Sequence, residues 1–128
     1  MSRTPWTLAT LMALALTAHA ASDPADPAML KLASTSGCLT CHHVEPGAAG
    51  PNSMAPIGPA WRDVATKYAA APTAADDLTR TVRAGSTPYA SHWKGKVSGL
   101  AMPPNAVAIK EPQARALVVW ILGLAPQH

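Results

Sequence analysis

Two cysteines and a histidine stand close together in Cys38-Leu39-Thr40-Cys41-His42, and the chain contains no other cysteine. Two thiols three positions apart can each add to a vinyl group of one porphyrin, and an imidazole that follows directly can ligate the iron. The spacing therefore predicts covalent attachment of one c-type haem through Cys38 and Cys41, with His42 as an axial ligand of the iron.

The same cysteine pair also occurs in two other kinds of site. A thioredoxin-like dithiol is expected within a βαβ pattern, but the stretch after His42 is rich in Gly, Pro and Ala and shows no strand-like alternation. A structural zinc site needs a second pair of ligands at a distance, whereas all the candidate ligands here lie between Cys38 and His43. Haem attachment is the favoured interpretation.

The second axial position decides what the haem does, because an open site binds gases or peroxide whereas a closed one mainly transfers electrons. Met102 is the preferred ligand there. A thioether is a weak ligand that needs a rigid support, and Pro103 and Pro104 stiffen its loop. The alternatives are His92, Met54 and an open site, although Met54 is better suited to covering the haem.

Capping residues and apolar periodicity predict several short helices. The first begins after Asp26, an N-cap followed by Pro27 at the first helical position, and ends near Gly37. In a later helix, Thr73 and Asp76 form a weak capping box. The other expected helices cover 61–68, the stretch from Thr73 to Gly85, and a last segment from near Pro112 that buries Leu117, Trp120, Ile121 and Leu124.

The segments between these helices, 44–59 and 86–111, have loop character, and Gly and Pro are frequent in the first of them. Such long loops are unusual in a small domain unless they wrap a rigid group. No strand and no internal repeat is expected. The predicted fold class is all-α, with four to five short helices and long loops wrapped around one covalently bound haem.

The first twenty residues have the three parts of a secretory signal: Arg3, an apolar stretch from Leu8 to Leu16, and small residues at Ala18 and Ala20. We expect cleavage near Ala20 and a periplasmic location, because haem is normally attached to exported chains outside the cytoplasmic membrane. No later segment is long enough to cross a bilayer, so stable membrane insertion is not expected. The predicted division is a signal peptide over 1–20, a short linker over 21–26 and one haem domain over 27–128.

The formal net charge is +3, and loss of Arg3 with the leader lowers it by one. The Lys and Arg residues are scattered along the chain, which gives no support to nucleic-acid binding. Lys94 and Lys96 could form a mildly basic rim that steers an acidic partner, with an ordinary solvated surface as the alternative.

Taken together, these segments resemble a small bacterial class I cytochrome c, with its attachment motif near the N-terminus and its Met-Pro loop before the last helix. The resemblance covers essentially the whole mature chain. It implies His/Met ligation by His42 and Met102, and a hydrogen bond from His42 to the Pro59 carbonyl. It also implies that Asn105 lies near the Met102 sulfur and that Trp93 reaches a haem propionate or packs on the haem edge. The matching segments are Cys38 to His42, Ile57 to Val64, Lys67-Tyr68 and Met102 to Asn105.

These features predict a periplasmic one-electron carrier that works between a donor and an acceptor redox protein and is not an enzyme. The alternative is a haem c electron-transfer subunit of a periplasmic oxidoreductase complex. A peroxidase would need a distal base, for which only His92 or His43 is available. A gas-binding helical bundle would carry its attachment motif near the C-terminus, whereas here the motif lies close to the mature N-terminus.

Overall fold

The structure is a computed structural model that describes residues 22–124, so the expected signal peptide over 1–20 lies outside the described residues. Within that range the regular structure is helical, and the only strand-like pairing is an isolated bridge between Ser22 and Leu124. The predicted all-α class is confirmed. The α-helices are α1 (Pro27–Thr35), α2 (Trp61–Tyr68), α3 (Ala74–Ala84) and α4 (Glu111–Leu122), with 3₁₀ turns at Cys38–Thr40, Pro51–Ser53 and Pro88–Ala90.

Helix α1 begins as its sequence predicts. The Asp26 carboxylate accepts hydrogen bonds from the backbone N–H groups of Ala28 at 2.9 Å and Met29 at 3.2 Å. Both donors belong to the first turn, where no backbone acceptor of the helix can reach them. After the C-cap at Ser36, Gly37 adopts the left-handed conformation with φ of 76°, which turns the chain into the cysteine motif.

Helix α3 has the predicted ends but not the predicted capping box. Thr73 is its N-cap residue, yet its side chain makes no capping hydrogen bond, so that prediction was wrong. The Thr73 hydroxyl instead donates a hydrogen bond to the Asp77 carboxylate. This hydrogen bond, and to a smaller extent a second one from Arg80, lowers the pKa of Asp77. Asp76 forms an ion pair with Arg115 of α4. Both acidic side chains therefore have partners other than the helix N-terminus.

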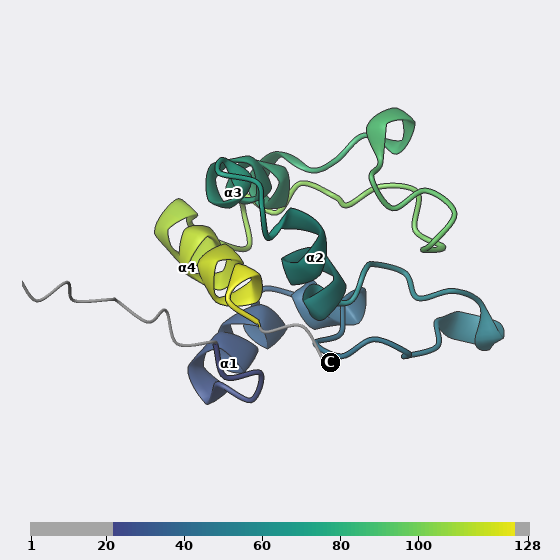
Figure 1. Ribbon diagram of the computed structural model, residues 1–128, viewed down its shortest axis with the longest axis horizontal. Coiled ribbons are helices and arrows are strands. Elements are labelled where there is room, and N and C mark those ends of the chain that lie inside the picture. Colours follow the sequence, from purple (N-terminus) through teal and green to yellow (C-terminus); the bar gives the residue numbers. More distant parts are fainter. Residues whose placement is uncertain (1–21, 125–128) are drawn as a thin grey trace, which may run out of the picture.

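Helix α4 packs against α1, α2 and α3, and Figure 1 shows it passing between α1 and α3 with α2 alongside. Its residues Leu117, Trp120 and Ile121 are buried, as is Leu124 directly after it. The Trp120 ring meets Trp61 of α2 edge to face, with 5.6 Å between ring centroids. The apolar periodicity of the last helix thus correctly predicted the residues of the core.

Residues 22–26, the described part of the expected linker, lie against the end of α4. The Ser22 N–H donates to the Gly123 carbonyl at 2.7 Å. The indole Nε1 of Trp120 donates to the Asp23 carbonyl at 2.8 Å. The two ends of the described chain are therefore fastened together.

The two long loops extend from the same side of the helices (Figure 1). They are joined by backbone hydrogen bonds from Ser98 to the Pro56 carbonyl at 2.9 Å and from Gly99 to the Ile57 carbonyl at 3.0 Å. A Cβ at Gly99 would lie 2.5 Å from the Ile57 oxygen, so this approach requires glycine. Every helix among residues 22–124 is too short or too polar to cross a membrane.

Candidate haem site

A cavity of ~590 Å³ lies between the helices and the two long loops. Cys38, Cys41 and His42 line it, and Met102 lines it from the second loop. Thiols, an imidazole and a thioether around an apolar space are the donor set and the surroundings that a covalently attached haem needs. The residues present therefore fit the group. Most of the other lining side chains are apolar, among them Ile57, Val64, Leu78, Val82, Leu117, Val118 and Ile121.

The cysteine motif is held in a tight 3₁₀ turn. The backbone N–H groups of Cys41 and His42 both donate to the Cys38 carbonyl, at 3.2 and 3.1 Å. Both cysteines are half-buried and free of any disulfide. Burial raises the pKa of the Cys38 thiol, and the neighbouring Cys41 adds to this effect. The turn thus presents both sulfur atoms to one cavity.

The His42 imidazole is fixed by a hydrogen bond and by stacking. Its Nδ1 lies 2.8 Å from the Pro59 carbonyl oxygen, which can only accept, so Nδ1 carries the proton and Nε2 keeps its lone pair. The ring also stacks on Trp61, with 6.0 Å between centroids and 21° between planes. Burial lowers the pKa of His42, although the Pro59 hydrogen bond opposes this shift. The proton fixed on Nδ1 and the lowering of the pKa by burial both suit a neutral imidazole ligand.

Gly58 is a site residue whose role the sequence did not reveal. Its N–H donates to the Cys41 carbonyl at 2.8 Å. A Cβ at this position would lie 2.7 Å from Cε1 of the His42 ring and 2.9 Å from its Nδ1. Glycine is therefore required for the segment before Pro59 to pass under the imidazole. The sequence shows only that position 58 is a glycine, because the contact between Gly58 and His42 joins residues sixteen positions apart.

The N-terminus of α2 is capped by the segment that follows the motif. The Trp61 N–H donates to the His43 carbonyl at 2.9 Å, and the Arg62 N–H donates to the Val44 carbonyl at 3.2 Å. Arg62 also pairs with Glu45, its Nε lying 2.7 Å from the carboxylate. These contacts satisfy donors that a helix cannot satisfy itself, and they tie the Trp61 end of α2 to the histidine motif.

Met102 is held by Ser86, another residue that the sequence did not single out. The Met102 N–H donates to the Ser86 hydroxyl at 2.8 Å, and the Ser86 N–H donates to the Met102 carbonyl at 2.9 Å. Directly before it, Gly85 has φ of +83°, and a Cβ there would lie 2.9 Å from the Met102 oxygen and 3.0 Å from the Pro104 nitrogen. The C-terminal end of α3 therefore anchors the methionine loop.

The other predicted site residues are divided between the cavity wall and its surroundings. Trp93 lines the cavity, as does His92, whose Nδ1 lies 2.5 Å from the Tyr68 hydroxyl. The Asn105 side chain donates to the Pro103 carbonyl at 2.8 Å and does not line the cavity. Met54 is 52% exposed and lies off the cavity wall, so the expectation that it covers the haem was wrong. The loop that carries it extends away from the helices (Figure 1).

The fold and this cavity define a small all-α protein built around one covalently held haem. The family model for cytochrome c matches residues 30–125. Cytochrome c-551 of Allochromatium vinosum is 41% identical over 101 residues, which cover 79% of this chain and 90% of that protein. Cytochrome c-551 of Pseudomonas aeruginosa is 29% identical over 119 residues, which cover 93% of this chain and 96% of that protein. The crystal structure of wild-type Nitrosomonas europaea cytochrome c552 is 34% identical, with a TM-score of 0.57, and the match covers 75% of this chain and 99% of that chain.

The chain belongs to the cytochrome c family and is a monohaem class I cytochrome c close to the bacterial cytochromes c-551 and c-552. The expected family, fold and cofactor are confirmed. It is an electron carrier rather than an enzyme, and haem c is its cofactor. Cys38 and Cys41 are the only cysteines in the chain that can hold the haem.

Proposed function

We propose that the chain is a periplasmic one-electron carrier whose haem is attached through Cys38 and Cys41 and ligated by His42 and Met102. The main support is that all four side chains line one cavity. When bound, the haem supplies an iron centre that gains or loses a single electron. The protein's task is to hold that centre in one geometry and to keep water from it.

On the histidine side, the Pro59 carbonyl keeps the proton on Nδ1 and so leaves Nε2 free to ligate. Trp61 stacks on the ring and Gly58 passes beneath it, which restricts rotation of the imidazole. A ligand that is already oriented needs little rearrangement when the charge on the iron changes. This side therefore supports rapid electron exchange.

On the opposite side, a thioether ligand favours the ferrous state more than a second histidine would. The proposed reduction potential is accordingly high within the range of c-type haems. The paired hydrogen bonds between Met102 and Ser86 hold this weak ligand in place. His92 also lines the cavity, with its Nδ1 2.5 Å from the Tyr68 hydroxyl, and it is the alternative ligand that the charge-transfer band distinguishes. The exposed Met54 lies off the cavity wall.

The proposal extends to the parts that the sequence alone supports. Residues 1–20 are a cleaved signal peptide, 21–26 are a short lead and 27–128 form the cytochrome c domain. The physiological partners are a donor and an acceptor redox protein in the periplasm. The pattern of Arg3, an apolar stretch and small residues at Ala18 and Ala20 supports this location.

The test is to express the full chain in a bacterium that matures c-type cytochromes. Haem staining should survive denaturing electrophoresis, and the ferric protein should show a methionine-to-iron charge-transfer band. Met102→Ala should abolish the band and open the ferrous protein to carbon monoxide, whereas Met54→Ala should leave both properties unchanged. A band that persists in Met102→Ala, or a colourless folded protein, would contradict the proposal.

A further inference from the structure

Arginines and lysines are used differently in the described part of the chain. Each described arginine pairs with a carboxylate: Arg62 with Glu45, Arg80 with Asp77, Arg83 with Glu111 and Arg115 with Asp76. Among residues 22–124, none of the five lysines forms a salt bridge. Three of these lysines are close to Trp93 in the chain or in space: Lys67, Lys94 and Lys96.

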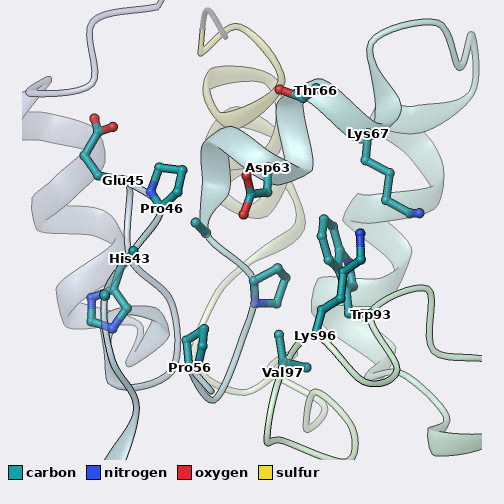
Figure 2. A pocket seen from close by; sticks show the side chains of 14 residues that line it. His43, Glu45, Pro46, Pro56, Asp63, Thr66, Lys67, Trp93, Lys96 and Val97 are labelled. Atoms are coloured by element: carbon teal, nitrogen blue, oxygen red, sulfur yellow. The ribbon is translucent and has the colours of Figure 1, made fainter. Parts of the chain in front are cut away.

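Two of the three lysines and Trp93 line a surface depression of ~400 Å³ beside α2 (Figure 2). The Lys67 ammonium lies 5.4 Å from the centroid of the Trp93 ring, within range of a cation–π interaction. Figure 2 shows Lys67 and Lys96 on the Trp93 side of the depression and Asp63 on the wall formed by α2. Lys94, next to Trp93 in the chain, is exposed.

The charge of this depression is positive on balance. Glu45 lines it, but its carboxylate is neutralised by Arg62 at 2.7 Å. Asp63 is the other acidic lining residue, and Figure 2 shows its carboxylate apart from the ammonium groups of Lys67 and Lys96. The imidazole of His43 also belongs to the wall. After the Arg62–Glu45 pair is set aside, Asp63 is, among the described residues, the one negative charge on the wall of the depression, against the positive charges of Lys67 and Lys96 and of Lys94 nearby.

The depression shares a wall with the candidate haem cavity. Pro59, Trp93 and Val97 line both spaces. Trp93 therefore lies between the proposed haem and a positively charged part of the protein surface. A partner that occupies the depression would be separated from the haem cavity by this thin layer of side chains.

We propose that the surface formed by Lys67, Trp93, Lys94 and Lys96, called here the Trp93 surface, docks an acidic redox partner and passes the electron through the Trp93 wall. This inference rests on the proposed function, because it requires haem in the adjoining cavity. Unpaired ammonium groups are free to meet carboxylates of a partner, whereas the paired arginines are not. Such charge steering raises association rates by about 10- to 1,000-fold at low ionic strength.

The first experiment uses the reduced holoprotein and two small acceptors of opposite charge. In the reaction with hexacyanoferrate(III), one electron leaves the haem iron and gives ferric protein and hexacyanoferrate(II), without transfer of a proton. The Lys67→Gln/Lys96→Gln variant is compared with Lys31→Gln/Lys110→Gln, which loses the same charge elsewhere. At an ionic strength of about 0.01 M, we expect the first variant to react about three- to tenfold more slowly and the second less than about twofold.

The cationic acceptor tris(phenanthroline)cobalt(III) distinguishes a loss of surface charge from a general loss of the protein's ability to give up an electron. Its reaction should not be slowed by Lys67→Gln/Lys96→Gln. With hexacyanoferrate(III), the difference in rate between the two variants should vanish in ~1 M salt, where the Debye length is about 3 Å. Equal slowing by the two lysine pairs would overturn the docking surface while leaving the electron carrier intact. Failure of the wild-type protein to pass electrons to either acceptor would instead contradict the proposed function.

Binding without electron transfer gives a second readout. A hexaglutamate peptide and the redox-inert anion hexacyanocobaltate(III) should each shift the indole N–H resonance of Trp93 in the NMR spectrum. The peptide should also compete with hexacyanoferrate(III). Both effects should be lost in Lys67→Gln/Lys96→Gln and kept in the control pair. Shifts confined to other faces, or binding to anionic vesicles without binding to hexaglutamate, would overturn the assignment of an acidic protein partner.

Discussion

The two sides of the candidate haem cavity are held by different kinds of contact. His42 stands against the packed core, because Trp61, which stacks on it, is only 4% exposed and meets Trp120 edge to face. Met102 stands in a loop whose neighbours Ala101 and Pro103 are exposed, and its backbone is held by Ser86. Packing positions one of the proposed axial ligands, and a pair of hydrogen bonds positions the other.

This difference indicates which of the two proposed ligands is released first. A contact made by buried aromatic rings is lost only when the core opens, and that requires a large part of the free energy of unfolding. A short segment held by a few exposed hydrogen bonds can detach locally at a cost of about 1 kcal/mol for each bond. We therefore expect the methionine side to open while the helices are still folded.

The largest expected effect comes from Trp61→Ala, which removes the ring between His42 and Trp120. Truncation of a buried aromatic residue costs about 3–5 kcal/mol in the free energy of unfolding. Denaturant unfolding followed by far-ultraviolet circular dichroism measures this loss. Trp61→Phe, which keeps an aromatic ring, should lose less than half as much. A small effect of Trp61→Ala would show that the histidine side does not depend on the core.

An intermediate effect is expected from Gly85→Ala, which acts on the methionine side. The new Cβ would meet the Met102 carbonyl at 2.9 Å in a backbone with φ of +83°. Left-handed backbone strain alone costs about 1–3 kcal/mol. The methionine-to-iron charge-transfer band should therefore disappear at a lower temperature than the helical dichroism.

Gly47→Ala is the matched control for this experiment. Gly47 has φ of +89°, but a Cβ there would meet nothing within 4 Å. It therefore carries the backbone strain without the contact to the ligand loop. If both variants lose the band at the same temperature, the close approach of Gly85 to Met102 does not support the ligand.

The smallest expected effect comes from Ser86→Ala, which removes the hydroxyl that accepts from the Met102 N–H. Because water can replace the hydroxyl at this exposed position, the loss should be about 0.5–1.5 kcal/mol. We expect carbon monoxide to bind the ferrous variant about two- to tenfold faster than the wild type, with the helices unaffected. Ser53→Ala, at the exposed turn of the first loop, should bind at the wild-type rate. If carbon monoxide binds Ser86→Ala at the wild-type rate, the Ser86 hydroxyl does not hold Met102 in place.

The sequence predicted those parts of the fold that depend on nearby residues. Asp26 and Pro27 located the start of α1, and Gly85 located the end of α3. The spacing of Trp61, Val64, Ala65 and Tyr68 predicted α2 from its first residue to its last. Each of these signals acts within one or two helical turns. Local rules therefore gave correct boundaries.

Contacts between distant segments were not predictable in the same way. One half of the capping box at Thr73 failed because Asp76 pairs with Arg115, thirty-nine positions away. Ser86 and Gly58 are small residues whose importance arises only when Met102 and His42 are brought next to them. Met54 had the right chemistry for a haem cover but stands in a loop that extends outward. A pattern of residue types along the chain does not show which distant segments come into contact.

The contacts of Ser22 with Gly123 and Leu124 bring the first and last described residues of the chain together. Since the two ends of the described fold meet, a short linker between them would make the polypeptide circular without disturbing α1 or α4. The ring could then be opened in the exposed turn between Asn52 and Ser53. In such a circular permutant the histidine and methionine motifs would exchange their order along the chain while keeping their places around the cavity.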